Sequence, residues 1–505
     1  MLPIRSLLLV MLFVCLLPWS AAAQSATPAP ATPPAVSPAL AEVRVMSFNI
    51  WLGGEQVDLG QVIAGIRASG ADVVGLQEAE GRTREIADAL GWPYADERMQ
   101  IISRLPLLTP PDSAGRYTLV QVRPGAVFAL ANVHLPSDPY GPEAVRDGAT
   151  PEDVRQLEEE TRLPVLQPVL AHVPALEAAG IPFVLTGDFN TPSSLDWTAA
   201  VAAARDQVAF PLAWPVSEAA FAAGLQDTFR AAHPDPVARP GLTWTPGYPS
   251  PTLRPGETLD RIDWVLASGK VEVLDSQVVG EGENPDVDIA VMPYPSDHRG
   301  VVSTLRLPPG TPPVLIAVDA RRVTQGDPLV VRYHAPGEDG ERLGIVPAGA
   351  DVAEVVMSLP PREAFVDGSD TFGTATLPSG GYDAVLIGAD GGELSRAHFE
   401  VVAPGALPAL TVVNASVPSG EPIEVAWQHA PGMKFDWIAI YEAGDPDLSN
   451  YWAYLYTGGE ISGALAIDAE AIGGPLDPGD YEVRLLRDDG YVVLATAPFT
   501  VTAAP

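Results

Sequence analysis

The last two fifths of the sequence repeat themselves, and this repeat limits the possible folds more than any other feature. His334-Ala335-Pro336-Gly337 recurs unchanged as His429-Ala430-Pro431-Gly432, a period of roughly 95 residues. A repeat of this length is a complete domain with its own core. Short alternating apolar runs lie between Gly, Pro and Asp turns in each copy. We therefore expect two tandem immunoglobulin-like β-sandwiches, at residues 312–403 and 407–503.

A proline-rich break at residues 307–313 separates the repeats from a different kind of sequence. Between residues 42 and 307, apolar β-rich runs alternate with helical stretches, among them one long helix from about Glu152 to Ala178. A chain of 505 residues is too long for a single core. The pattern predicts a mixed α/β domain that precedes the two sandwiches.

The first 23 residues have the three parts of a secretory signal peptide: a charge at Arg5, an apolar run from Leu7 to Trp19, and small residues up to Ala23. Residues 24–41 are a Pro/Ala-rich spacer. The single cysteine, Cys15, lies in the apolar run, so the mature protein should carry no thiol. We expect a secreted or periplasmic protein without a transmembrane segment; an uncleaved anchor is the alternative.

The chain is strongly acidic, with a formal net charge of -35. Lys270 and Lys434 are its only lysines. Nonspecific affinity for polyanions should be weak, which makes long duplex DNA a poor candidate partner. A local arginine patch could still hold a phosphate. The acidic run Glu158-Glu159-Glu160 in the predicted long helix is expected to be a solvated face.

Polar side chains collect at the ends of the apolar runs of the predicted α/β domain. Taken singly, an Asp or Asn after a strand is most often a cap or a turn residue, and a lone His can be a hydrogen-bonded core residue. The ordered set is more informative, because it predicts that several strand ends meet at one site. Its members are Asn49, Gln77-Glu78, His134, Gly187-Asp188-Phe189-Asn190, Asp263 and Ser296-Asp297-His298.

These motifs, the GDFN and SDH segments above all, resemble those of the endonuclease/exonuclease/phosphatase superfamily. The resemblance runs from Val43 to about Leu305. It implies the fold class α+β, with a four-layer α/β/β/α sandwich and the site at one end of its two sheets. It also implies an enzyme that hydrolyses phosphate esters by in-line attack of water.

The same resemblance implies roles on the metal side of the site. Glu78 matches the direct ligand of a catalytic divalent metal, Asn49 lies beside it, and Asp297 belongs to the closing pair. Independent of the resemblance, converging carboxylates about 4 Å apart repel one another by ~4 kcal/mol per pair at a dielectric of 20. Oxygen ligands favour Mg2+, with Mn2+ or Ca2+ as substitutes, whereas the absence of mature cysteine disfavours zinc.

On the reacting side, the resemblance implies that Asp188 and Asn190 position the attacking water and the phosphoryl oxygen. His134 would donate to the phosphate or the leaving group. Asp263 would orient His298, and His298 would be a general base or a phosphate contact. A histidine held by a carboxylate is a suitable group for moving a proton at neutral pH.

A loop before Asp260 carries two aromatic residues, Trp244 and Tyr248. They either bind substrate by stacking on a base or sugar, or pack under the loop. The tandem sandwiches offer no catalytic set, and their duplicated His334 and His429 are interpreted as structural. A surface or glycan contact is the expected role of the sandwiches.

We therefore predict an exported, metal-dependent phosphoric ester hydrolase, either a phosphodiesterase or a phosphatase. Its substrate would be a phospholipid headgroup or a nucleotide-like ester. A secreted Mg2+-dependent nuclease is one alternative, because it would use the same site. A second alternative is a catalytically inactive binding protein that works through its sandwiches, although an idle site has no reason to keep so many costly polar groups.

Overall fold

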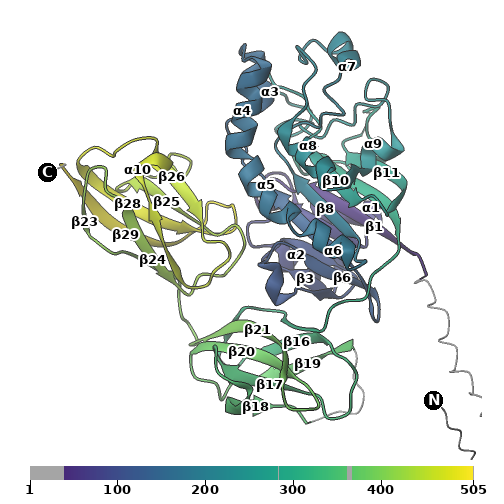
Figure 1. Ribbon diagram of the computed structural model, residues 1–505. Coiled ribbons are helices and arrows are strands. Elements are labelled where there is room, and N and C mark those ends of the chain that lie inside the picture. The colour runs from purple at the N-terminus through teal and green to yellow at the C-terminus, as the bar shows by residue number, and fades with distance from the viewer. Residues whose placement is uncertain (1–38, 283, 361–366, 504–505) are drawn as a thin grey trace, which may run out of the picture. The chain divides into compact units, whose positions relative to one another are not determined.

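The computed structural model describes residues 39–282, 284–360 and 367–503 (Figure 1). The predicted signal peptide and nearly all of the spacer lie outside these residues. The described part of the chain contains no helix with the length and apolar character that crossing a membrane requires. Residues 39–503 belong to one compact unit.

Two β-sheets form the centre of the α/β domain. The first has the order β12-β11-β13-β1-β2-β4-β3 and the second the order β5-β6-β7-β8-β10-β9. The strands of the first sheet are β1 (Ala41–Asn49), β2 (Val73–Gln77), β3 (Tyr94–Asp96), β4 (Ile101–Ser103), β11 (Glu272–Gly280), β12 (Ile289–Ala290) and β13 (Gly300–Leu307). Those of the second are β5 (Leu107–Leu108), β6 (Thr118–Arg123), β7 (Ala126–His134), β8 (Phe183–Asp188), β9 (Leu225–Asp227) and β10 (Asp263–Ser268).

Helices cover the outer faces of both sheets. The first sheet packs against α1 (Leu59–Ser69) and α2 (Thr83–Leu90). The second packs against α5 (Leu163–Leu170), α6 (Val173–Ala178) and α8 (Pro215–Ala222). A third apolar cluster joins the inner faces of the two sheets. The predicted four-layer architecture is confirmed. The remaining helices of this domain are α3 (Gly141–Arg146), α4 (Pro151–Thr161), α7 (Ala199–Ala204) and α9 (Thr228–Ala232).

Near the site, the two sheets meet through polar side chains. The Asn132 Oδ1 atom accepts hydrogen bonds from Gln77 Nε2 at 2.7 Å and Thr186 Oγ1 at 2.9 Å, and all three residues are buried. Gly75 permits this approach, because a Cβ atom there would lie 2.1 Å from Thr186 Oγ1. A buried polar group is costly to leave without a hydrogen-bond partner. This network therefore fixes the spacing of the two sheets beneath the site.

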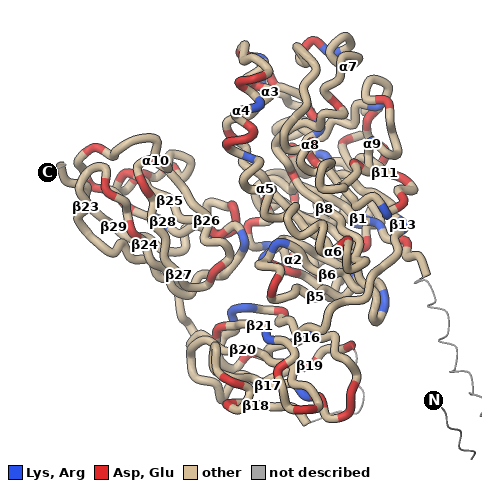
Figure 2. Tube along the Cα trace, viewed as in Figure 1, with Lys and Arg blue, Asp and Glu red and all other residues tan. Residues whose placement is uncertain are grey.

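The predicted long helix is wrong, since the segment forms three helices, α4, α5 and α6. Pro164 and Pro174 each stand in the first turn of a new helix, where a missing N–H is tolerated. The predicted solvated face is also wrong at Glu158, which is fully buried and accepts a hydrogen bond from Arg162 at 3.0 Å. Figure 2 shows acidic residues in all three domains of the described part of the chain, consistent with the net charge.

The two repeats form two β-sandwiches with the same strand order, as the sequence predicts. In the first sandwich, the sheets are β14-β16-β19 and β15-β21-β20-β17-β18; in the second, β22-β24-β27 and β23-β29-β28-β25-β26. The first comprises β14 (Leu315–Val318), β15 (Arg322–Thr324), β16 (Pro328–His334), β17 (Arg342–Pro347), β18 (Met357–Ser358), β19 (Asp367–Gly373), β20 (Gly380–Ile387) and β21 (Glu393–Val402). The second comprises β22 (Ala409–Val412), β23 (Ser416–Pro418), β24 (Ile423–Gln428), β25 (Trp437–Glu442), β26 (Ala453–Tyr456), β27 (Gly463–Ile467), α10 (Ala469–Ile472), β28 (Gly479–Leu486) and β29 (Val493–Thr502).

Candidate active site

The polar strand ends of the α/β domain meet at one edge of the two sheets. Asn49 ends β1 and is paired with Gln77, the last residue of the parallel strand β2. His134 ends β7 and is paired with Asp188, which ends β8. Asp263 begins β10, which runs antiparallel to β8, and is also paired with Asp188. Strand direction and register therefore bring these residues together.

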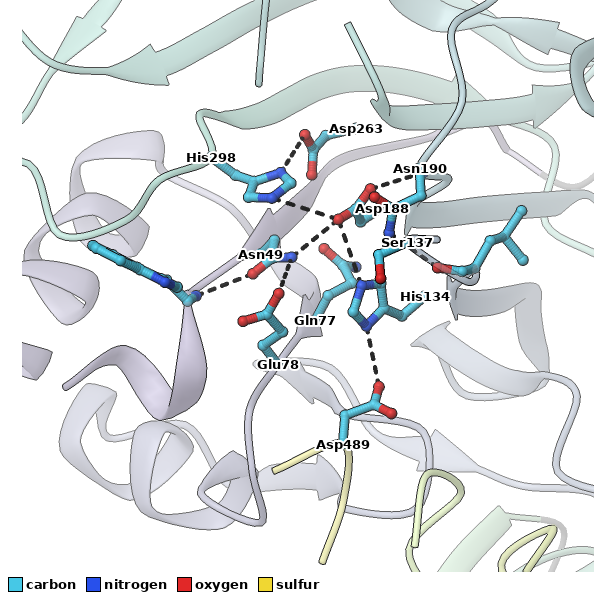
Figure 3. A network of polar contacts seen from close by, with 12 residues as sticks. Asn49, Gln77, Glu78, His134, Ser137, Asp188, Asn190, Asp263, His298 and Asp489 are labelled. Carbon is cyan, nitrogen blue, oxygen red and sulfur yellow. Dashed lines mark hydrogen bonds and ion pairs between the residues drawn. The ribbon is translucent and has the colours of Figure 1, made fainter. Parts of the chain in front are cut away.

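Asp188 is the centre of the site and is 1% exposed (Figure 3). Its Oδ2 atom accepts a hydrogen bond from Asn49 Nδ2 at 3.0 Å. The same oxygen lies 3.6 Å from the Nε2 atoms of both His134 and His298. One carboxylate thus faces two imidazoles that come from different strands and loops.

His298 is held entirely by the α/β domain. Its Nδ1 atom lies 3.0 Å from Asp263 Oδ2, and its backbone N–H donates to Ser296 Oγ. Ser296 Oγ in turn donates to the carbonyl of Asn49 at 2.7 Å. Burial alone would lower the pKa of His298, but the charges of Asp263 and Asp188 outweigh it and hold the pKa well above its usual range.

His134 is held from the second sandwich. Its Nδ1 atom lies 3.1 Å from Asp489 Oδ2, in the turn that follows β28 (Figure 3). Burial opposes protonation, but the hydrogen bond and charge of Asp489 and the charge of Asp188 outweigh it and raise the pKa of His134 to about 9. The expectation that the sandwiches offer no catalytic set is therefore corrected, because a sandwich carboxylate orients a histidine of the site.

The neighbouring residue Asp488 anchors this turn to the α/β domain. Its two carboxylate oxygens accept hydrogen bonds from the Gly81 backbone N–H and from Gln100 Nε2, both at 2.7 Å. Asp488 is fully buried, and burial raises its pKa to about 8. A second contact joins the Lys434 backbone N–H to the Arg98 carbonyl at 3.0 Å.

Asn190 shapes the turn that presents Asp188. Its backbone lies in the left-handed region, with φ 50, which Asn adopts more readily than most residues. Its backbone N–H donates to Asp188 Oδ1 at 2.9 Å, and its side-chain nitrogen donates to the Leu135 carbonyl at 3.0 Å. Asn190 therefore fixes the orientation of Asp188 as well as lining the site.

The carboxylates of Glu78 and Asp297 fit a divalent cation. Asp297 Oδ1 is buried without a hydrogen-bond partner in the described part of the chain. Burial, with a smaller contribution from the charge of Glu78, raises the pKa of Asp297 to about 7 against the opposing charge of His298. Asn49 turns its amide nitrogen toward Glu78 at 2.9 Å, and its oxygen accepts from Trp51 N–H, so it orients Glu78. A cation would relieve this crowding of negative charge.

A second grouping comprises Asp188, Asp263 and His298, whose ligand atoms lie within 4.8 Å of one another. These three residues are buried, as a metal cluster would be. The hydrogen bond between Asp263 and His298 already accounts for their proximity, however. Glu78 and Asp297 are therefore the better candidates to hold a cation, because Asp297 Oδ1 has no hydrogen-bond partner in the described part of the chain.

The site opens into a cavity of about 290 Å3. The α/β domain contributes Trp51, Leu52, Glu78, His134, Leu135, Pro136, Ser137, Asp188, Asn190, Trp244, Asp297 and His298 to its walls, and the second sandwich contributes Trp437, Tyr451, Tyr454, Tyr456, Asp489 and Tyr491. The ring of Trp244 lies 4.6 Å from the ring of His298, at an interplanar angle of 52°. Tyr248 does not line the cavity and packs against Trp244 and Trp51. A cavity of about 390 Å3 elsewhere contains none of the predicted site residues.

The residues from the second sandwich are absent from the set that the motifs predict. Asp489 stands in the sequence Asp488-Asp489-Gly490, which is typical of an ordinary turn. The one available signal is the concentration of aromatic residues between Phe435 and Tyr456. That signal suggests a surface with a function but does not say where the surface lies.

The chain is similar to several known proteins. An uncharacterized protein of Caenorhabditis elegans is 28% identical over 284 residues, which span 51% of this chain and 90% of that protein. A solved endonuclease/exonuclease/phosphatase from Beutenbergia cavernae is 19% identical, covering 71% of this chain and 99% of its own, with a TM-score of 0.34. A mannosyl-6-phosphatase of Bacteroides thetaiotaomicron is 15% identical, covering 52% and 99%, with a TM-score of 0.30.

TDP2 of Caenorhabditis elegans is 19% identical, covering 52% of this chain and 75% of its own, with a TM-score of 0.31. Similarities at this level give no information on substrate. The sequence model of the Endonuclease/Exonuclease/phosphatase family matches residues 46–298, half of the chain. The chain therefore belongs to the endonuclease/exonuclease/phosphatase family.

Proposed function

We propose that this protein is an exported, metal-dependent phosphoric ester hydrolase that acts on phosphodiesters. The observation that carries the proposal is the arrangement of two histidines around Asp188, each backed by its own carboxylate. Such an arrangement supplies one group that takes a proton and another that gives one. The proposal of export rests on the signal-like segment at residues 1–23.

Proton transfer follows from the positions of the two histidines. Water attacks phosphorus in line with the departing alcohol, so that one P–O bond forms while the opposite P–O bond breaks. Asp188 accepts the proton of the attacking water, while His298, whose pKa is held well above its usual range, stays protonated beside that carboxylate. His134, kept protonated by Asp489, donates a proton to the departing alcohol oxygen. Asn190 holds Asp188 in place throughout.

Glu78 and Asp297 would hold Mg2+, with Asn49 orienting Glu78. When bound, the cation supplies charge stabilisation of the phosphoryl oxygens. The oxygen ligands of this site suit Mg2+, Mn2+ or Ca2+.

The lining of the cavity supports a substrate other than long duplex DNA. A DNA strand presents many phosphates, and proteins neutralise them with Lys and Arg. The described residues that line the cavity are carboxylates, histidines, aromatic and aliphatic residues, Ser137 and Asn190, with no Lys or Arg among them. We therefore favour a small phosphodiester, such as a phospholipid headgroup or a nucleotide-like ester, over the nuclease alternative.

Hydrolysis of bis(p-nitrophenyl) phosphate, a phosphomonoester, sphingomyelin and plasmid DNA should be measured with Mg2+ and with a chelator. Glu78→Gln tests the cation, and Glu85→Gln, on the surface of α2, is its matched control. We expect metal-dependent turnover that Glu78→Gln abolishes and Glu85→Gln preserves. Turnover that survives chelation would contradict the metal, and no turnover of any substrate would favour an inactive binding protein.

A further inference from the structure

Five rings of the second sandwich form one wall of the cavity. This aromatic wall consists of Trp437, Tyr451, Tyr454, Tyr456 and Tyr491. Trp437 is buried, but Tyr451, Tyr456 and Tyr491 are 36%, 37% and 39% exposed. Large aromatic side chains rarely remain this accessible in a group without a binding role.

The rings stand nearly perpendicular to one another. Tyr451, Tyr454 and Tyr491 lie 5.4, 5.8 and 5.9 Å from Trp437, at interplanar angles of 73°, 82° and 83°. Tyr451 and Tyr454 are in turn 5.4 Å apart at 74°. Perpendicular rings present electron-rich faces in several directions, which is the arrangement that attracts an organic cation.

The first sandwich shows that the fold does not require the wall. Trp437 pairs with Leu486 across β25 and β28, and the matching pair in the first sandwich is Arg342 with Ile387. The bulge between Leu485 and Leu486 recurs between Leu386 and Ile387, so the following turns also correspond.

Two more residues of the aromatic wall, Tyr454 and Tyr491, also have non-aromatic counterparts in the first sandwich. Tyr454 pairs with Ala439, and the corresponding pair in the first sandwich is Ser358 with Gly344. The turn after the bulge is one residue longer in the second sandwich, so Tyr491 corresponds to Gly392 counting from the bulge and to Gly391 counting back from the next strand. The rings are therefore specific to the sandwich that lines the site.

Charge selects among the ligands that could contact these rings. The cavity is lined by four carboxylates, Glu78, Asp188, Asp297 and Asp489, and by two histidines. The four carboxylates outnumber the two histidines, no Lys or Arg is among the described residues that line the cavity, and the phosphate of a diester would add a further negative charge. A further phosphate would be repelled, whereas a cation would be attracted.

Building on the function proposed above, we propose that the aromatic wall is a subsite for a compact organic cation, such as a quaternary ammonium group, carried by one alcohol of the phosphodiester. A neutral polyol could also stack on tyrosine rings. The excess of negative charge in the cavity favours the cation.

The test compares three p-nitrophenyl phosphodiesters. The second alcohol is choline, its uncharged isostere neohexyl alcohol, in which carbon replaces nitrogen, or glycerol. We expect kcat/KM for the choline ester to exceed that for the neohexyl ester by about tenfold or more, the range of a desolvated cation–π contact. Tyr451→Leu and Tyr491→Leu should reduce this ratio toward one. Trp452→Leu is the matched control, because Trp452 is 47% exposed beside Tyr451 and does not line the cavity.

Calorimetric titration with phosphocholine and neohexyl phosphate, on the same full-length proteins with Mg2+, gives a readout that does not need turnover. Tighter binding of phosphocholine that Tyr491→Leu removes would support the subsite even if no ester were hydrolysed. Equal kcat/KM for the choline and neohexyl esters, with metal dependence intact, would overturn the subsite and leave the proposed function standing. Preference for the glycerol ester would also overturn it. Tight phosphocholine binding without hydrolysis would instead count against the proposed function.

Discussion

The two histidines of the site face the same carboxylate but are supported from different parts of the molecule. His298 is oriented by Asp263, which begins the neighbouring strand β10 of the same domain. His134 is oriented by Asp489, which lies 355 residues away in the second sandwich. Both imidazoles are 3.6 Å from Asp188. The fold of the α/β domain thus guarantees one half of the site, and domain docking provides the other.

The His298 half and the His134 half of the site therefore depend on different contacts. The His298 half is present whenever the two sheets have formed, because its hydrogen bonds come from strand ends and the Ser296 loop. The His134 half also requires the contacts of Asp488 with Gly81 and Gln100. Substitutions and pH changes can therefore affect one half of the site without the other.

The largest effect is expected from His298→Ala. Without the charged imidazole beside it, Asp188 is no longer held as the proton acceptor, and losing acid–base catalysis lowers kcat by about 10²- to 10⁴-fold. Steady-state kinetics on bis(p-nitrophenyl) phosphate measures the loss, and circular dichroism checks the fold. His334→Ala is the matched control, because His334 pairs with Asp367 in the first sandwich. A His298→Ala enzyme within tenfold of wild type would remove His298 from the proposed mechanism.

Asp263→Asn should have the second-largest effect, about 100-fold in kcat. The substitution keeps the shape of the side chain but removes the charge that holds the His298 ring. Because Asp263 is fully buried, solvent cannot replace the lost contact. If Asp263→Asn lowered kcat less than Asp489→Asn does, the His134 half of the site would contribute more to catalysis than the His298 half, contrary to this prediction.

Asp489→Asn should reduce kcat by roughly tenfold, since His134 then loses one partner but keeps Asp188 nearby. His134 is active as an acid when protonated, so activity falls as pH rises through its pKa of about 9. Without the Asp489 charge that pKa decreases, and the alkaline limb of the pH–rate profile should move to lower pH. Asp390→Asn is the control, because Asp390 occupies the corresponding turn of the first sandwich and accepts from Gly392 N–H. An unmoved alkaline limb would show that Asp489 does not act through His134.

The smallest effect concerns the pH dependence of docking. The Asp488 carboxyl loses its proton near 3.8 in the unfolded chain but near 8 when buried. The docked form therefore binds an extra proton between these values. Its stabilisation is complete below about pH 4 and is lost as pH rises through 8. We expect docking to weaken progressively as the pH rises over this range.

Protease cleavage of the segment between the sandwiches, followed against pH, measures this loss. Asp488→Asn has no proton to lose and serves as the comparison, with a much flatter pH profile. Identical pH profiles for the two proteins would assign the dependence to another group, of which Asp436, with a pKa raised by burial to about 7, is the nearest candidate.

Local sequence patterns predict one half of this site and miss the other for a physical reason. Asn49, Glu78 and Asp188 follow buried strands, and the ends of neighbouring strands meet at one sheet edge, so their meeting can be read from the sequence. Asp489 has no such signal, because its position depends on how two separate domains dock. A turn residue that reaches another domain looks, in sequence, like a turn residue that caps its own backbone.

Contacts that local sequence does not show also explain the wrong predictions for Glu158 and for the long helix. Glu158 looks like one of three equivalent solvated carboxylates, yet the burial of Arg162 beside it draws only that one inward. The three helices between Pro151 and Ala178 keep the apolar pattern of a single helix. Only the prolines in that segment indicate where the chain bends.

Because a ribosome makes a chain from its N-terminus, the order of residues is also an order in time. The α/β domain, with His134 and Asp188, emerges long before Asp489 does. A nascent chain can therefore fold its phosphoesterase core while His134 still lacks its orienting carboxylate. Full activity would then begin only after both sandwiches have been synthesised. The second sandwich would therefore set the time at which the enzyme becomes active, as well as forming a wall of its cavity.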